Sequence, residues 1–207
     1  MEPPVVPRDR LDGWQRVDEA TERAFAAGPV SVDASTVRYE RTATEPPRPF
    51  CFASRLRIRP MTAPNSALTA LVERRARSGF RDRLAERGIE DVEHRGDRGI
   101  AIDDPAASRA TLSTFRGIAR VGTGGRRVPV EALIAVWTAG EYLLGGGAYP
   151  LGETGRALGG GAYPLGETGR ALGGESDSPG EGPADARREL RGIVRGIEPP
   201  AACDGTD

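Results

Sequence analysis

The chain has 207 residues, enough for one ordinary domain that buries roughly 70% of the surface its unfolded chain exposes. All 29 basic residues are arginine and 30 residues are acidic, so the formal net charge is −1. This balance excludes a general electrostatic attraction to nucleic acid or to anionic lipid, although local basic patches remain possible.

Targeting and redox signals are absent from the sequence. Cys51 lies in an apolar run and Cys203 in the polar tail, and their spacing matches neither a disulfide framework nor a zinc site. The first residues lack the basic start and apolar stretch of a secretory signal. No uncharged window approaches the roughly 20 apolar residues of a membrane helix. We therefore predict a cytoplasmic protein with reduced thiols, no cofactor and no membrane contact.

The first elements are predicted from hydrophobic spacing. Apolar residues recur at helical spacing between Trp14 and Phe25, and the Gly-Pro pair at 28–29 ends the pattern, so we predict a short first helix. Alternation over 30–39 changes phase midway, which indicates a strand with a bulge or bend. Over 50–59 the alternation is clean, with arginines on one face, and predicts a regular strand.

A long amphipathic helix is predicted between Asn65, a favourable N-cap residue, and Gly88, a favourable stop. Its apolar positions form one continuous stripe: Leu68, Leu71, Val72, Ala76, Phe80 and Leu84. We expect this stripe to pack against a sheet.

Strands are predicted after this helix around Val92, over 100–102 and over 112–121, and the glycine-rich segment 122–125 should close a hairpin. Segment 128–138 is apolar on both of its faces. We therefore predict a central strand covered on both sides.

An exact repeat follows the last predicted strand, 141–144. Residues 144–157 recur without change as 158–171, which implies a recent tandem duplication. We interpret the glycines of the repeat as a turn that leaves the strand. Because the first copy directly follows the strand, we expect it to keep the ancestral position while the second copy loops out at little cost.

These elements predict an α+β fold, with a largely antiparallel sheet of about six strands packed by one long central helix and a C-terminal helix. The C-terminal helix is predicted from the apolar stripe between Ala186 and Ile197. The predicted organisation is a flexible N-terminus (1–13), one domain (14–198) that includes the duplicated segment (144–171) and an acidic linker (175–184), and a disordered tail (199–207).

Three segments, 50–59, 81–93 and 135–150, resemble an uncharacterised family of haloarchaeal proteins with a domain of unknown function. The resemblance covers 14–150, and its most specific part is the Val-Trp, Glu-Tyr and Gly-Gly-Ala-Tyr-Pro series of the third segment. It implies no catalytic motif. The order of elements is also similar to the PsbP-like fold, whose members are mostly accessory or binding modules, and this likeness implies interaction more than chemistry.

The repeat fits part of a phosphate-binding loop, because 147–154 and 161–168 both match G-x-x-x-x-G-x-T. The lysine position, however, is occupied by Glu153 in one copy and Glu167 in the other. A carboxylate there repels the phosphates that the lysine attracts. We therefore predict no nucleotide site in the repeat.

His94 is the only histidine, so any histidine-dependent triad or metal site must be built around it. The nearby carboxylates belong to Glu90, Asp91, Glu93 and Asp97. Neighbouring strand residues point to opposite faces, and nearby arginines offer ordinary ion pairs, so we favour a solvated surface strand. A metal- or His94-dependent enzyme is the alternative.

Arginines gather in two places that together could bind phosphates: the long helix (Arg74, Arg75, Arg77, Arg81, Arg83 and Arg87) and one face of the 50–59 strand (Arg55, Arg57 and Arg59). No interleaved aromatic residues are present to stack on bases, so any such binding would be unselective. We favour a helix face laced with ion pairs, and we expect Trp137 and Tyr142 to lie in the core.

The sequence therefore assigns no catalytic, cofactor-binding or metal-binding residue. Our first hypothesis is a non-enzymatic interaction or small-ligand-binding module, with a protein partner possible. An unrecognised enzyme and an arginine-rich binder of nucleic acid or acidic protein are the alternatives, and nucleic acid is the partner we expect least.

Overall fold

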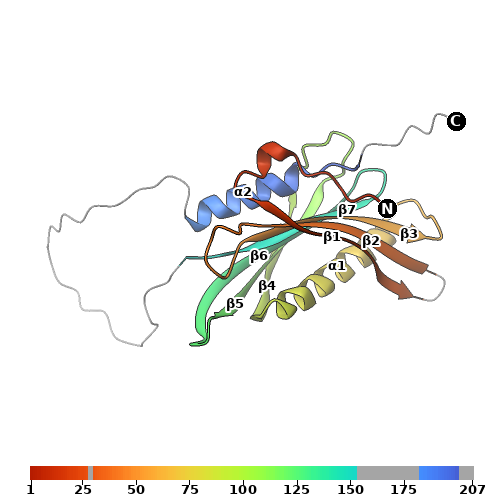
Figure 1. Cartoon of the computed structure of the whole chain (residues 1–207). Coiled ribbons are helices and arrows are strands. Elements are labelled where there is room, and N and C mark those ends of the chain that lie inside the picture. Colours follow the sequence, from red (N-terminus) through yellow and green to blue (C-terminus); the bar gives the residue numbers. More distant parts are fainter. Residues whose placement is uncertain (28–29, 153–181, 201–207) are drawn as a thin grey trace, which may run out of the picture.

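The computed structural model describes residues 1–27, 30–152 and 182–200. Within these residues, seven strands form one antiparallel sheet in the order β1-β2-β3-β7-β6-β5-β4, with two α-helices on it (Figure 1). The elements are η1 (Arg8–Arg10), β1 (Gln15–Ala27), β2 (Val30–Glu40), β3 (Phe50–Arg59), α1 (Ser66–Glu86), β4 (Ile89–Ile100), β5 (Ala110–Val121), β6 (Arg126–Thr138), β7 (Tyr142–Pro150) and α2 (Pro183–Arg195). The predicted α+β class and antiparallel sheet are confirmed, with one strand more than the predicted number.

The two helices lie on opposite faces of the sheet (Figure 1). Side chains alternate between the faces along each strand, which gives two cores. The α1 core contains Val72, Phe80 and Leu84 of the helix. The α2 core contains Leu190, Ile193 and Val194, together with Ile197 just beyond the helix.

Several predicted elements are confirmed. The Asn65 side chain caps α1 by accepting a hydrogen bond from the backbone N–H of Leu68 at 3.0 Å. The β5–β6 hairpin pairs Val121 with Arg126 across the predicted turn. β6 lies between β5 and β7, and residues 130–137 are all buried, as expected of a central strand.

The predicted first helix is wrong. Residues 15–27 form β1, an edge strand paired with β2. The residues between Trp14 and Phe25 have fair helix propensity, but of the predicted stripe only Phe25 packs against the α1 core, and Val17 is 45% exposed. Pairing with β2 overrides the local preference. The many charges of β1 suit an edge, because they discourage pairing with another chain.

The predicted bulge in β2 is also wrong, because β2 pairs with β3 without any register shift. The change of phase has another cause. Val32 and Ala34 belong to the α1 core, whereas Val37 belongs to the α2 core, so the two ends of a regular strand bury opposite faces. Register shifts occur instead in β1, at Val17 and Ala24.

The first three glycines of the first repeat copy, at 145–147, lie inside a strand and not in a turn. β7 continues from Tyr142 to Pro150 and pairs with both β3 and β6. Gly145 and Gly147 face α2. A Cβ on Gly145 would lie 2.3 Å from Ile197 Cδ1, and one on Gly147 would lie 2.1 Å from the Phe50 carbonyl oxygen. These glycines therefore let α2 approach the sheet closely.

The strand predicted at 100–102 is the end of a longer one, because β4 runs continuously from Ile89 to Ile100. It also includes the segment predicted around Val92. Ile102 lies outside the strand and packs against the α2 core.

Segments near the two ends of the chain, at Val5 and Glu198, meet beside α2. The backbone of Val5 pairs with that of Glu198 through hydrogen bonds of 2.9 and 3.0 Å, and Val6 is buried. The predicted C-terminal helix is confirmed as α2, which begins inside the segment predicted as the linker. The second repeat copy, most of the linker and most of the tail lie outside the described residues.

Candidate functional site

The helices cover different parts of the sheet. α1 packs mainly over β4 and β6, and α2 packs over β7 on the opposite face. A single helix about 10 Å wide cannot cover seven strands spaced about 4.8 Å apart. Each face therefore keeps an open region. On the α1 face this region is a groove of about 490 Å³, lined by the helix and by β1, β2, β3, β6 and β7.

The floor of the α1 groove is apolar. It consists of side chains that point toward α1: Ala34, Phe50, Phe52, Leu56, Ile134 and Leu144. Phe52 pairs with Gly146 across the β3–β7 ladder. A Cβ on Gly146 would lie 3.0 Å from the Phe52 ring and 2.4 Å from the Leu133 carbonyl oxygen. The absence of a side chain at Gly146 thus allows the Phe52 ring to pack close to the backbone of the sheet.

Aromatic residues form the walls of the α1 groove. Phe80 of α1 lies 5.7 Å from Phe52 and 5.9 Å from Phe115, measured between ring centroids. Phe25 of β1 also lines the groove, with the Arg75 guanidinium of α1 5.7 Å from its ring centroid. The groove therefore offers aromatic surfaces from α1, β1 and β3.

A short polar strip crosses this floor. The Thr36 and Ser54 hydroxyls, on paired positions of β2 and β3, form a hydrogen bond of 2.7 Å. Arg38 lies two residues further along β2 on the same face, where it binds Asp18 of β1. A guanidinium has five N–H donors, so Arg38 keeps donors beyond those that this carboxylate occupies.

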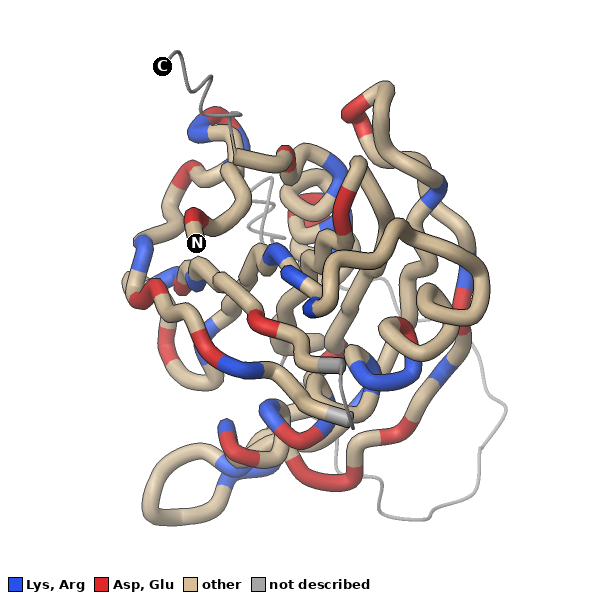
Figure 2. Tube along the Cα trace, turned by 90° about the vertical axis from the view of Figure 1, so that its right-hand side faces the viewer, with Lys and Arg blue, Asp and Glu red and all other residues tan. Residues whose placement is uncertain are grey.

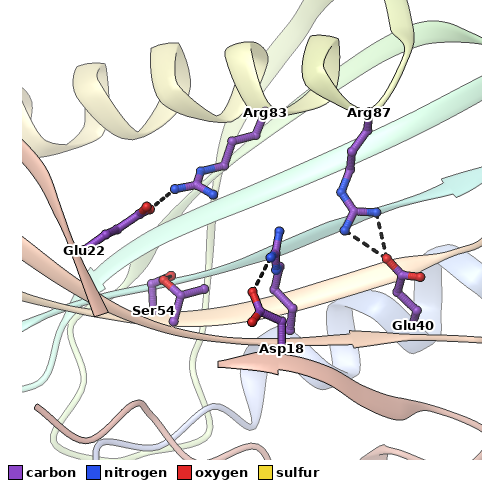
Figure 3. A network of polar contacts seen from close by, with 8 residues as sticks. Asp18, Glu22, Glu40, Ser54, Arg83 and Arg87 are labelled. Atoms are coloured by element: carbon purple, nitrogen blue, oxygen red, sulfur yellow. Dashed lines mark hydrogen bonds and ion pairs between the residues drawn. The ribbon is translucent and has the colours of Figure 1, made fainter. Parts of the chain in front are cut away.

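Two further ion pairs link α1 to the strands across the groove, as Figure 3 shows. Arg83 binds Glu22 of β1, and both guanidinium NH₂ groups of Arg87 donate to one carboxylate oxygen of Glu40 in β2 at 2.9 Å. The Arg87 guanidinium also lies 4.1 Å from the Phe50 ring centroid, a cation–π distance. These pairs form a charged rim around the apolar floor.

The bulge in β1 completes the groove. Glu22 pairs with Ala34 and Phe25 pairs with Val32, so both face α1 although they are three residues apart. In a regular strand such residues point to opposite faces. The extra residue, Ala24, corrects the phase and brings a rim carboxylate and an aromatic wall to the same side.

The His94 carboxylates do not form one centre. Each of three acidic residues has its own arginine: Glu90 pairs with Arg120 at 2.7 Å, Asp91 with Arg127 at 3.1 Å and Glu93 with Arg95 at 3.1 Å. Only Asp97 approaches His94, with 2.8 Å between Oδ1 and Nε2. The interpretation of β4 as an ion-paired surface strand is confirmed for these residues.

Ser113 adds a hydroxyl to the His94–Asp97 pair, but in the wrong order for a catalytic triad. Its Oγ donates to Asp97 Oδ1 at 2.6 Å, so the carboxylate and not the histidine lies in the middle. Burial raises the pKa of Asp97, but these hydrogen bonds and the charges of His94 and Arg77 outweigh it, and the pKa lies below its ordinary value. The serine is only 2% exposed, and its hydroxyl contacts the carboxylate and not the histidine.

The arginine clusters do not combine into one phosphate-binding surface. Arg83 and Arg87 of α1 are paired, and Arg77 approaches Asp97 at 3.4 Å. Arg55 binds Glu141 at 2.6 Å on the opposite face of the sheet from α1. Figure 2 shows basic and acidic residues interspersed along the described trace. The ion pairs of Arg77, Arg83 and Arg87 agree with the favoured interpretation of an ion-paired helix face, and the alternative of one joint phosphate-binding surface has no support.

The other candidate residues are placed as follows. Trp137 and Tyr142 are each 2% exposed and lie in the core as expected. Burial raises the pKa of the Cys51 thiol well above its ordinary value, which makes it a poor nucleophile. Gly147 of the supposed phosphate loop lies within β7, and the rest of that motif from Glu153 on lies outside the described residues.

Across residues 1–27, 30–152 and 182–200, no group of three or more His, Cys, Asp or Glu side chains could hold a metal ion. No helix in that same part of the chain is both long and apolar enough to cross a membrane.

Sequence reasoning missed the α1 groove. Its polar strip comes from isolated residues, Thr36, Arg38 and Ser54, that no motif connects. One feature of the sequence could have indicated it. Positions 36, 38 and 54 lie on the core-facing sides of their strands but carry no large apolar residue. That signal becomes readable only when the β2–β3 register is known.

Comparison with known proteins gives one match. A family model described as a domain of unknown function (DUF6517) matches residues 3–198. No curated protein and no solved structure matches the chain.

Proposed function

Since this chain belongs to the family defined by the domain of unknown function DUF6517, whose description names no activity, we propose a function from the geometry of the α1 groove. The protein binds a small amphipathic anion, with an apolar body and a carboxylate head. The observation that carries this proposal is a groove of about 490 Å³ whose apolar floor holds a hydroxyl pair and an arginine.

The size and lining of the α1 groove support a small molecule. Ligand pockets have volumes of roughly 300–1,000 Å³ and are mostly apolar, with a few polar groups that orient the ligand. Here the aromatic rings of Phe25, Phe52 and Phe80 surround the apolar part. The Thr36–Ser54 pair and Arg38 are the orienting groups.

The charges of the α1 groove support an anionic head. Arg38, Arg83 and Arg87 each bind a carboxylate of this chain, and these carboxylates show the chemistry that the arginines accept. In the Arg83–Glu22 pair, the side chains of both partners are about half exposed. Exposed pairs of this kind contribute at most about 1 kcal/mol, so a ligand carboxylate can replace or join such a partner at little cost.

The proposal fits the first sequence hypothesis, a binding module, and requires no catalytic group. The cytoplasmic location, the haloarchaeal origin, the PsbP-like likeness and the tandem duplication stay predictions from the sequence. The two other hypotheses have less support, because the carboxylates near His94 are separately paired and the two arginine clusters face opposite ways.

Calorimetric titration with decanoate, below its micelle concentration, tests the proposal. A Cβ on Gly79, which lines the groove, meets no atom within 4 Å, and neither does one on Gly192 of α2. We therefore expect Gly79→Leu to fold and to weaken decanoate binding at least tenfold, while its matched control Gly192→Leu binds like the wild type. No binding by the wild type, or equal losses in both variants, would overturn the proposal.

The head group is tested separately with Arg38→Gln. Because its guanidinium is the orienting charge on the floor, this variant should bind decanoate about tenfold more weakly and bind decanol as the wild type does. An equal loss for both ligands would contradict the assignment of the carboxylate to Arg38.

A further inference from the structure

The opposite face of the sheet has its own open region, the α2 cleft. It lies beside α2 over β4, β5 and β6, has a volume of about 370 Å³, and is mostly polar in its lining residues. Five arginines line it: Arg95, Arg98, Arg116, Arg187 and Arg191. The acidic residues of the lining are only two, Asp97 and Glu131. The cleft therefore carries a local excess of positive charge in a chain that is nearly neutral overall.

Glu131 is the anchor of the α2 cleft. It lies on β6 with 1% of its surface exposed, and it accepts hydrogen bonds from the Tyr149 hydroxyl and from Arg187 Nε, the latter at 2.6 Å. A second Arg187 nitrogen binds its other oxygen, and Arg116 Nε approaches to 3.6 Å. This carboxylate is thus saturated by its own partners, and it fixes Arg187 at the edge of the cleft, while Arg116 is held only loosely.

Two arginines of the α2 cleft have no carboxylate partner among the described residues. Arg98 of β4 is exposed and forms no ion pair with the described residues, and Arg191 of α2 likewise forms none. The Arg191 Nε is buried, yet it donates to no acceptor in the described part of the chain. A buried N–H without an acceptor is costly, which makes this nitrogen a ready donor to an incoming anion.

The remaining acidic residue does not neutralise these arginines. Asp97 lines the cleft, but its Oδ1 already accepts hydrogen bonds from Ser113 and His94, and its Oδ2 is approached by Arg77. Arg95, for its part, is paired with the exposed Glu93 at 3.1 Å. The charge left without a partner therefore belongs to Arg98 and Arg191, with Arg116 only loosely held.

We propose that the α2 cleft is a binding site for a phosphate-type anion, either inorganic phosphate or the phosphate group of a small monoester, held by Arg98, Arg116 and Arg191. Planar guanidinium groups bind phosphate oxygens through paired N–H donors, and a monoester carries close to two negative charges near pH 7. The site is independent of the α1 groove, since the sheet separates the two.

The test uses the full chain at low ionic strength, titrated calorimetrically with inorganic phosphate and, in parallel, with glycerol 3-phosphate. We expect saturable binding of both. Arg98→Gln and Arg191→Gln should each weaken it about tenfold. Arg74→Gln is the matched control, because Arg74 is exposed on α1, forms no ion pair with the described residues and lies outside the cleft. It should bind as the wild type does.

Further controls separate the possible sources of a signal. Sodium chloride at matched ionic strength should give no saturable heat, and circular dichroism should show that the variants keep the fold. Tighter binding of glycerol 3-phosphate than of phosphate identifies a monoester as the ligand, whereas equal affinities identify the free anion. An unchanged affinity in both cleft variants, an equal loss in Arg74→Gln, or tighter binding of citrate than of either phosphate would overturn the proposal.

Discussion

On the α1 face, Arg38, Arg83 and Arg87 each bind a carboxylate beside an apolar floor, whereas on the α2 face Arg98 and Arg191 line a polar cleft without carboxylate partners among the described residues. Both openings arise in the same way, because one helix covers only part of a wide sheet. The comparison shows that the side chains lining an open region are determined by the strands that the helix leaves uncovered. The way the helix packs on the sheet does not determine them.

The faces also differ in how tightly the helix packs. α2 rests on Gly145 and Gly147, where any Cβ would clash, whereas Gly79 of α1 has free space around it. The α2 helix is therefore packed tightly against the strand beneath it, whereas α1 has free space beside Gly79. The predictions below test this contrast in order of decreasing effect.

Tyr149 should be the most sensitive residue of the comparison. It is 2% exposed in the α2 core and its hydroxyl binds Glu131, so Tyr149→Ala should lower the free energy of unfolding by about 4 kcal/mol. Tyr163 occupies the same position in the second repeat copy and lies outside the described residues. We predict a much smaller loss for Tyr163→Ala in urea denaturation. Equal losses would mean that either copy can supply the strand.

The two faces should respond oppositely to the same glycine substitution. Gly147→Ala forces a methyl group against the Phe50 carbonyl and the Leu190 side chain, and we expect a loss of about 3 kcal/mol. Gly79→Ala adds a methyl group in open space within a helix and should stabilise the protein by up to about 1 kcal/mol. Chemical denaturation of both variants checks the sign, and a destabilised Gly79→Ala would contradict a loosely packed α1 face.

Removing Arg187, the partner of the buried Glu131 carboxylate, should lower the free energy of unfolding by a smaller amount. Loss of one member of a buried pair typically costs about 3–5 kcal/mol, but the Arg187 side chain is 38% exposed and Arg116 stays nearby. For Arg187→Met we therefore expect about 2 kcal/mol, measured by thermal unfolding. Arg188→Met, one residue along α2 in an exposed pair with Asp185, is the control and should cost less than about 0.5 kcal/mol.

Acid should act on the same network. Burial raises the pKa of Glu131, but hydrogen bonds from Arg187 and Tyr149 and the arginine charges outweigh it, and the pKa lies below its ordinary value of 4.5. A carboxyl group whose pKa is lower in the folded state stabilises the protein at pH values above the ordinary pKa of the group. This stabilisation is lost as the pH falls through the pKa of the folded state. The free energy of unfolding should thus decline below about pH 4.5, and it should decline less steeply in the Glu131→Gln variant.

A second carboxylate accounts for the residual slope in Glu131→Gln. Asp97 also has a lowered pKa, so it loses stabilising interactions with acid in the same direction. Because its side chain is 39% exposed, its share should be the smaller one. A variant profile as steep as that of the wild type would contradict the role given to Glu131.

Elements with one dominant local signal could be predicted from the sequence. α1 has a cap, a stop and an apolar stripe, and β6 is apolar on both faces, so both appear as expected. β1 and β7 lack such signals. β1 has the composition of a helix and forms a strand because it pairs with β2. β7 contains three consecutive glycines, which indicate a turn in the sequence but pack against α2 and Phe52 in the structure.

The candidate sites were beyond prediction for a related reason. The α1 groove joins β1, β2, β3 and α1, and the α2 cleft joins β4, β5, β6 and α2, so each depends on strand order. Alternation predicts which residues share a face of one strand, but it does not predict which strands are neighbours. The Glu131–Tyr149–Arg187 network, with members far apart in sequence, shows the same limit.

Intermolecular nuclear Overhauser effects between decanoate and the protein test the central claim most directly. The account predicts contacts from the decanoate chain to the ring protons of Phe52 and Phe80, which lie in contact with each other and line the α1 groove. It predicts none to Leu190 or Ile193 in the α2 core. Contacts confined to those α2-side residues, or bound decanoate without any contact to the two rings, would contradict it.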